Sequence, residues 1–130
     1  MVGRHSLIRF VLLQMILAVS LSLVVSSGMK EFFHEPRPCE NLSNCPDSYS
    51  FPSRHTAAAF AMVTVFSFWT RRWVYRILSV VAAGLVGYWR FLIEFHTLYD
   101  VFVGTVIGIV IGIVVYYLAK SRKRYKSFYK

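Results

Sequence analysis

The chain has 130 residues, of which 56% are hydrophobic and only 16% are charged, and it carries a formal net charge of +9. This composition is too apolar for an ordinary soluble domain of that length. The basic excess alone would suit a nucleic-acid ligand, but its distribution along the chain indicates membrane topology instead, and we expect no nucleic-acid partner.

Four long apolar segments follow one another along the chain. Residues 10–29 and 101–119 carry no charge, and residues 56–70 are uncharged and can extend back to Ser53. Residues 74–93 are apolar apart from Arg76 and Arg90 near the two ends. Each is about as long as a helix that crosses roughly 30 Å of hydrocarbon, and none alternates strictly as a barrel strand would. We therefore predict an all-α fold, an integral membrane bundle of about four transmembrane helices, as a single membrane-embedded domain over residues 1–130.

The charges between these segments orient the bundle. With the N-terminus inside, the inner segments hold eleven cations and no acid: Arg4, Arg9, Arg71, Arg72, Arg76, Lys120, Arg122, Lys123, Arg124, Lys126 and Lys130. The outer segments hold four cations and all six acids: Lys30, Arg37, Arg54, Arg90, Glu31, Glu35, Glu40, Asp47, Glu94 and Asp100. The positive-inside rule then predicts cytoplasmic termini in a plasma-membrane protein. The basic tail adds attraction to anionic membrane lipids.

A cleaved signal peptide is the alternative for the first segment, because a short basic region precedes it and Ser26, Ser27 and Gly28 end it. Its apolar run of 20 residues is longer than the roughly 7–15 residues usual in signal peptides. We therefore expect a retained helix.

The two cysteines, Cys39 and Cys45, lie in the predicted first outer loop. The extracytoplasmic side is oxidising, so we expect a disulfide that restrains Arg37 relative to His55. A metal site is not expected, because no histidine pair stands at ligand spacing.

Three motifs fall at the outer ends of the segments: Lys30-x6-Arg37-Pro38, Pro52-Ser53-Arg54-His55 and Arg90-x5-His96-x3-Asp100. A membrane-buried chain has little reason to keep such groups unless they form a site. Three cations suit one phosphoryl group, to which guanidinium groups bind in bidentate fashion. One histidine can then attack the phosphorus and the other can protonate the leaving group.

The second and third motifs also predict local structure. Ser53 precedes an apolar helix as a favourable N-cap, so phosphate oxygens would meet free amides and the helix dipole there, with His55 in the first turn. His96 and Asp100 are four residues apart and share a face if a helix begins near His96. The carboxylate would fix the imidazole tautomer and leave the other ring nitrogen free to attack.

Each residue also has a purely structural interpretation. Lys30 and Arg90 suit interfacial anchors, Asp100 suits a helix cap, and either histidine suits a structural role. Their joint occurrence on one membrane face favours a site. His5 and His34 match no motif and are expected to be structural or exposed.

With these three motifs the chain resembles the type-2 phosphatidic acid phosphatases, which share a superfamily with vanadium-dependent haloperoxidases. The resemblance covers residues 30–112 and includes Ser50-Phe51 before the second motif and Gly104 after the third. Two positions differ from the family pattern: Arg54 replaces glycine and Trp89 replaces serine. Arg54 adds a fourth cation, which suits a diphosphate. The chain also matches only the last four helices of six-helix members.

The resemblance implies catalysis by His96 as nucleophile, His55 as acid and base, and Asp100 as the group that orients His96. The phosphate-binding residues would be Lys30, Arg37, Ser53, Arg54 and Arg90, and no cofactor or metal is implied. We expect hydrolysis of a lipid phosphate at the extracytoplasmic face, with an isoprenoid diphosphate carrier preferred. Phosphatidate and phosphatidylglycerol phosphate stay open.

Other functions also stay open. They are a lipid phosphotransferase, a vanadate-loaded peroxidase, a non-catalytic lipid-phosphate binder or transporter, and a small structural membrane protein. Gly104, Gly108 and Gly112 recur every four residues and permit close helix packing. That packing could lie within the chain or build a homo-oligomer.

Overall fold

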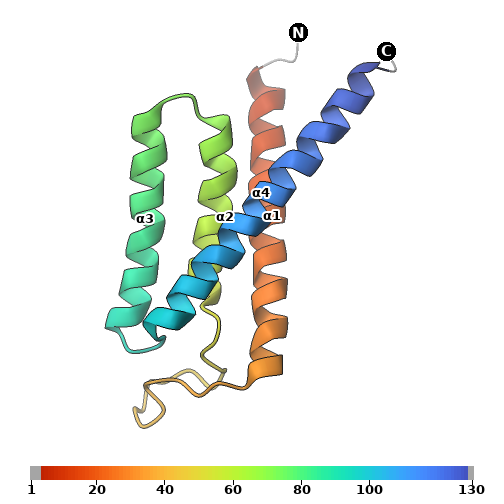
Figure 1. The fold of residues 1–130 in the computed structure, drawn as a ribbon. Helices are drawn as coiled ribbons and strands as arrows, with labels where there is room; N and C mark the ends of the chain where they lie inside the picture. Colours follow the sequence, from red (N-terminus) through yellow and green to blue (C-terminus); the bar gives the residue numbers. More distant parts are fainter. Residues whose placement is uncertain (1–3, 129–130) are drawn as a thin grey trace.

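The computed structural model describes residues 4–128, with side chains described for residues 6–122. Within that range it consists of four helices and no strand (Figure 1): α1 (Arg4–Phe33), α2 (Arg54–Trp69), α3 (Trp73–Leu92) and α4 (Leu98–Phe128). The predicted all-α fold is confirmed. α2 and α3 agree with the predicted segments to within about a turn, and α1 and α4 extend beyond theirs at both ends.

The helices run up and down, so that both chain ends lie at one end of the molecule (Figure 1). The long α1–α2 loop and the short α3–α4 turn lie at the opposite end. In the described part of the chain, Ser6–Phe33 and Leu98–Arg122 are long and apolar enough to cross a membrane. Two helices could therefore cross a membrane by length and composition, and a crossing by all four stays a prediction.

α2 is the central helix and packs against each of the other three. The core at this contact is small and apolar, formed by Ala18, Ala61, Val65 and Val115. Large aliphatic side chains point outward instead; Leu13 is 65% exposed and Val24 is 70% exposed. Small residues inside and large ones outside are typical of helices that pack tightly while facing lipid.

The glycine series of α4 lies directly on α2. A Cβ atom at Gly104 would stand 2.6 Å from the carbonyl oxygen of Ser53, and one at Gly112 would stand 2.6 Å from the Cβ of Thr64. At Gly108 it would meet the carbonyl oxygen of Ala57 and, at 2.8 Å, the amide nitrogen of Ala61. The glycine face therefore serves packing within the chain, and a homo-oligomer, which stays a prediction, would need another surface.

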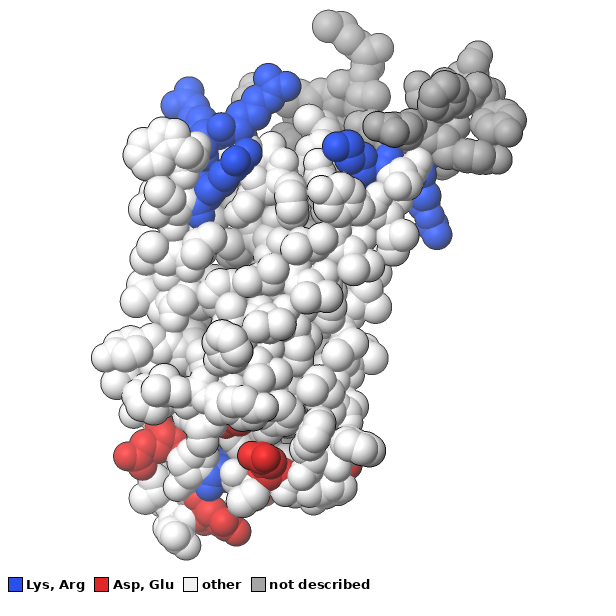
Figure 2. All heavy atoms as spheres, viewed as in Figure 1, with Lys and Arg blue, Asp and Glu red and all other residues white. Residues whose placement is uncertain are grey.

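Charged side chains separate to the two ends of the bundle (Figure 2). The end with the chain termini carries Arg9, Arg71, Arg72, Arg76, Lys120 and Arg122. The acids gather at the other end, together with Lys30, Arg37, Arg54 and Arg90. The side chains of Arg4, Lys123, Arg124, Lys126 and Lys130 lie outside the described residues. This separation is the pattern from which the orientation was predicted.

Gly108→Ala tests the α2–α4 contact. We expect it to lower the free energy of unfolding by about 1–3 kcal/mol, because the added methyl group meets the backbone of α2. Gly84→Ala is the matched control, since a Cβ atom added there would meet nothing within 4 Å; the gain in helix propensity should stabilise it by up to about 1 kcal/mol. Thermal unfolding in detergent measures both. Equal stability of the two variants would contradict the contact.

Candidate active site

The three predicted motifs meet at the end of the bundle that carries the acids. Lys30 lies in the last turn of α1, Arg37 in the α1–α2 loop and Arg90 in the last turn of α3. Arg54 and His55 open α2 directly after Ser53. His96 lies in the α3–α4 turn, and Asp100 lies in the first turn of α4. Hydrogen bonds at this end of the bundle join residues far apart in the sequence.

Lys30 is buried and holds the loop that precedes α2. Its Nζ donates to the carbonyl oxygens of Tyr49 and Ser50, both at 2.6 Å. A buried ammonium group requires such partners. Lys30 therefore positions the segment before the second motif and adds its charge to the site.

Arg37 is buried and joins the same loop to the α3–α4 turn. Its Nε donates to the carbonyl oxygen of Ser48 at 2.6 Å, its Nη2 donates to the Ser48 hydroxyl at 2.9 Å, and its Nη1 donates to the carbonyl oxygen of Phe95 at 2.7 Å. Nη1 also lies 3.4 Å from Nε2 of His96.

This last contact fixes the tautomer of His96. A guanidinium group can only donate, so Nε2 of His96 must accept with its lone pair. The proton of the neutral imidazole is then on Nδ1, which lies 3.6 Å from Oδ2 of Asp100. A separation of 3.6 Å is too long for a hydrogen bond, but it places the carboxylate beside the protonated nitrogen. The lone pair of the neutral ring is therefore on Nε2.

Asp100 is fully buried and has other partners as well. Its Oδ2 accepts a short hydrogen bond from the Ser50 hydroxyl and one at 2.7 Å from the Thr97 amide. Thr97 Oγ1 accepts from the Asp100 amide at 3.2 Å. This reciprocal pair is a capping box, which starts α4 and fixes the carboxylate.

Three buried polar atoms of the site have no hydrogen-bond partner among the described residues: Nδ1 of His96, Oδ1 of Asp100 and Nε of Arg90. Such atoms are rare in folded proteins because desolvation without a partner is costly. Their presence in one cluster indicates groups reserved for chemistry or for a ligand.

Ser53 is the N-cap residue of α2, as predicted, but its side chain does not cap the helix. Its hydroxyl pairs with that of Thr56 at 2.9 Å, and its amide donates to the carbonyl oxygen of Asp100 at 3.1 Å. The Ser53 amide is therefore already hydrogen-bonded within the protein. The amides of Arg54, His55 and Thr56, in the first turn, have no carbonyl of their own helix to bond.

The remaining cations approach the site from α2 and α3. Arg90 lies over the ring of Phe95 with Cζ 4.9 Å from the centroid, and Arg37 lies 6.0 Å from the same centroid. Phe95 therefore supports both guanidinium groups. Arg54 is half-buried, and its charge acts on Lys30, Arg37 and Arg90.

His55 is exposed at the start of α2. It lies within electrostatic range of His96, Arg90, Arg54 and Arg37. Its exposure leaves it open to water and to a leaving group, whereas His96 is only 2% exposed.

The predicted disulfide is present between Cys39 and Cys45. It closes the outer part of the loop two residues after Arg37. His34, one of the two histidines outside the motifs, is exposed and packs edge-on against Tyr49 with ring centroids 4.6 Å apart. The side chain of His5 lies outside the described residues. No group of three His, Cys, Asp or Glu side chains in the described range could hold a metal ion.

Four further residues contribute to the site without a predicted role: Ser48, Ser50, Phe95 and Thr97. Thr97 was detectable, because Thr97-x2-Asp100 is a capping-box pattern ahead of an apolar run. Ser50 was noted only as context before the second motif, without a role. Ser48 and Phe95 act partly through backbone carbonyl groups that any residue carries.

The chain is similar to known proteins in sequence and in fold. The sequence profile of the PAP2 superfamily matches residues 11–124. The crystal structure of LpxE from Aquifex aeolicus is similar, with a TM-score of 0.71 and 32% sequence identity over 87% of this chain and 77% of that chain. No curated protein sequence matches significantly.

The pKa of His96 tests the geometry independently of activity. Burial lowers this pKa below the usual 6.5, and Arg37 and Lys30 lower it further, whereas Asp100 raises it. The imidazole therefore stays neutral as the pH falls through about 6.5 and becomes charged only at lower pH. We expect Arg37→Gln to raise the midpoint and Asp100→Asn to lower it.

An NMR titration of labelled histidine, assigned with His96→Gln, measures this midpoint. Glu94→Gln is the control, because this exposed acid of the same turn should leave the midpoint unchanged. A wild-type midpoint at or above the value of an unperturbed histidine would refute the buried, cation-flanked position.

Proposed function

The chain belongs to the PAP2 superfamily, and we propose that it is a lipid phosphatase that cleaves an isoprenoid diphosphate through a phosphohistidine at the extracytoplasmic face of the membrane. The observation that supports this mechanism best is the position of His96. Its Nε2 accepts from Arg37 while its Nδ1 faces Asp100.

The proposed reaction has two displacements at phosphorus. Nε2 of His96 attacks the terminal phosphorus in line with the leaving oxygen, and the N–P bond forms as the P–O bond breaks. The Nδ1 proton stays on the ring, and Asp100 stabilises the resulting positive charge. His55 gives a proton to the leaving lipid phosphate. It then takes a proton from water, whose oxygen attacks the phosphohistidine and restores His96.

Cations stabilise the charge that the equatorial oxygens carry in the transition state. Arg37 already touches His96, and Arg90 has a free buried Nε nearby. The first amides of α2 add donors at a positive helix terminus. Lys30 contributes its charge while it holds the loop. Protein cations supply the charge stabilisation that a metal would otherwise provide, so we propose metal-independent catalysis.

The same arrangement supports the membrane placement and the substrate. All four helices would cross the bilayer, with the basic end in the cytoplasm and the site at the outer interface. A phosphate head then reaches the site while its tail stays in the bilayer. Arg54 has no hydrogen-bond partner among the described residues and stands at the helix start. It therefore suits the second phosphate of a diphosphate, and phosphatidate or phosphatidylglycerol phosphate is the alternative.

His96→Ala should lower phosphate release from isoprenyl diphosphate at least about a thousandfold, because the covalent route is lost. Activity of the wild type should survive a chelator. His34→Asn is the control and should keep full activity, since His34 lies outside the site at a positive φ that asparagine also adopts. Release of phosphate by His96→Ala at the wild-type rate would exclude this nucleophile.

If no lipid phosphate is turned over but binding persists, the chain is a lipid-phosphate binder instead. Measurement of both release and binding for isoprenyl diphosphate, isoprenyl monophosphate and phosphatidate separates these functions.

Arg54→Gln tests the diphosphate preference. We expect kcat/KM for isoprenyl diphosphate to fall about tenfold, because one charge-assisted hydrogen bond is lost, and kcat/KM for the monophosphate to fall less. Arg72→Gln removes an exposed arginine at the other end of the bundle and should change neither value. Equal losses for both substrates would assign Arg54 to the reacting phosphate and remove its support for a diphosphate.

A further inference from the structure

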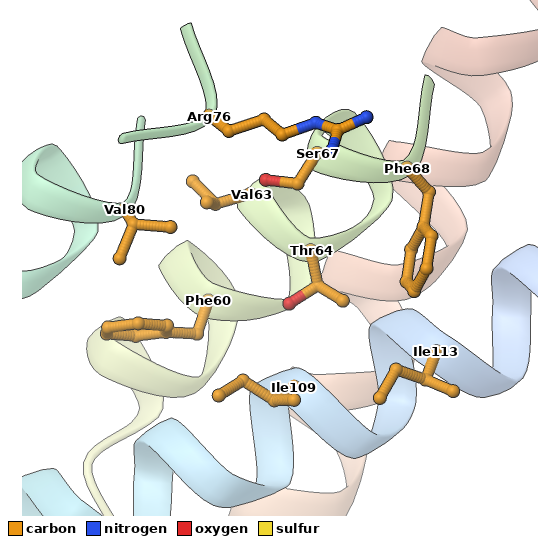
Figure 3. A pocket seen from close by; sticks show the side chains of 9 residues that line it. All are labelled: Phe60, Val63, Thr64, Ser67, Phe68, Arg76, Val80, Ile109 and Ile113. Carbon is orange, nitrogen blue, oxygen red and sulfur yellow. The ribbon is translucent and has the colours of Figure 1, made fainter. Parts of the chain in front are cut away.

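A cavity lies on the opposite half of the bundle from the catalytic residues. It has a volume of about 390 Å³, within the range of roughly 300–1,000 Å³ that small-molecule sites occupy. Its side chains come from three helices (Figure 3), with α2 as the floor and α3 and α4 as the walls. They include Thr64, Ser67, Arg76, Val80, Ile109 and Ile113.

The cavity exists because α3 and α4 hardly touch. They leave the same short turn, and α4 then runs obliquely away from α3 (Figure 1). Between them the face of α2 stays uncovered, and the walls are aliphatic at Val80, Ile109 and Ile113. A groove of this kind suits a hydrocarbon chain.

One end of the groove is polar. Arg76 crosses it above Ser67 (Figure 3), and the Ser67 hydroxyl is buried without a hydrogen-bond partner among the described residues. Nε and Nη2 of Arg76 donate to the carbonyl oxygen of Thr70 at 3.1 and 2.7 Å. These bonds hold the guanidinium group at the opening and leave Nη1 for a ligand. Arg71 and Arg72 are exposed beside it.

A lipid head group bound in the catalytic site cannot also reach this polar end of the groove. Arg76 and Arg90 are fourteen residues apart on α3, which corresponds to about 21 Å of helix at 1.5 Å per residue. The polar end of the groove and the catalytic site therefore lie near opposite faces of the bilayer in the proposed membrane placement.

We propose that this groove binds an anionic phospholipid of the cytoplasmic leaflet, with its phosphate at Arg76 and Ser67 and one acyl chain between α3 and α4. Charge complementarity selects this occupant. The described charged side chains at this end of the molecule are all basic, so a second copy in the same orientation would bring cations against cations. Basic pockets between helices on the cytoplasmic side are suited to anionic head groups. The proposal rests on the proposed orientation of the bundle, with its basic end in the cytoplasm, but not on enzymatic turnover.

Binding can be measured by native mass spectrometry of the full chain in detergent, with dioleoyl phosphatidylglycerol and dioleoyl phosphatidylcholine as probes. We expect wild type to retain phosphatidylglycerol at least about tenfold more than phosphatidylcholine, as one charge-assisted contact would give. Arg76→Gln should remove that preference, whereas Arg72→Gln, whose arginine does not line the groove, should largely keep it.

A second pair of variants tests the groove without changing charge. Val80→Trp fills the space between α3 and α4 and should abolish retention of phosphatidylglycerol, while Leu85→Trp adds the same bulk at a 60% exposed position of α3 outside the lining and should not. All four variants should keep the cooperative thermal unfolding of the wild type in detergent, which shows that they are folded.

Three results would overturn the proposal. Equal retention of the two lipids, or unchanged retention in Val80→Trp, would exclude a specific site. Displacement of phosphatidylglycerol by isoprenyl diphosphate in His96→Ala would show that the groove holds the tail of the substrate. A dimer that disappears in Val80→Trp would make a second copy the occupant. Because retention is measured without turnover, an inactive protein that retains phosphatidylglycerol would refute only the proposed enzymatic function.

Discussion

The buried carboxylate of Asp100 is the group on which the rest of the site depends. Its Oδ2 accepts from Ser50 in the long loop and from Thr97 at the start of α4, and it faces Nδ1 of His96. Its main-chain carbonyl group accepts from Ser53 at the start of α2. One residue thus fixes the loop, the α3–α4 turn and two helix starts relative to one another.

The site is held together mostly by carbonyl dipoles rather than by ion pairs. Lys30 and Arg37 bind the carbonyl oxygens of residues 48, 49, 50 and 95 instead of acids. Carbonyl groups stabilise buried cations without cancelling their charge, so the positive field of the cluster remains available to an anion. An acid at each of these places would neutralise the pocket and weaken its attraction for phosphate.

Much of this site was predictable from the sequence, because charged residues in apolar segments stand out. The four helices, the disulfide and the family resemblance are confirmed. Of the predicted residues, Arg37, Ser53, His96 and Asp100 are joined by direct contacts, and Lys30 reaches them through Ser50. The partners of these residues were not predictable. Ser50 and Ser48 act from an irregular loop whose path no periodicity fixes, and Phe95 acts partly through its carbonyl group. The spacing of Gly104, Gly108 and Gly112 indicated close packing but not its partner, which only the fold identifies as α2.

The contact between that glycine face and α2 links the two halves of the proposed catalytic apparatus. His55 belongs to α2 and Asp100 belongs to α4, so their relative height depends on how one helix lies along the other. Sliding by one turn would displace them by about 5.4 Å, and the backbone of α2 at Ser53, Ala57 and Ala61 fits too closely around the glycines to permit smaller shifts. Bilayers of different thickness ordinarily change the tilt of single helices. In the proposed membrane placement α2 and α4 must tilt together, which keeps the distance between His55 and Asp100 independent of the thickness of the membrane.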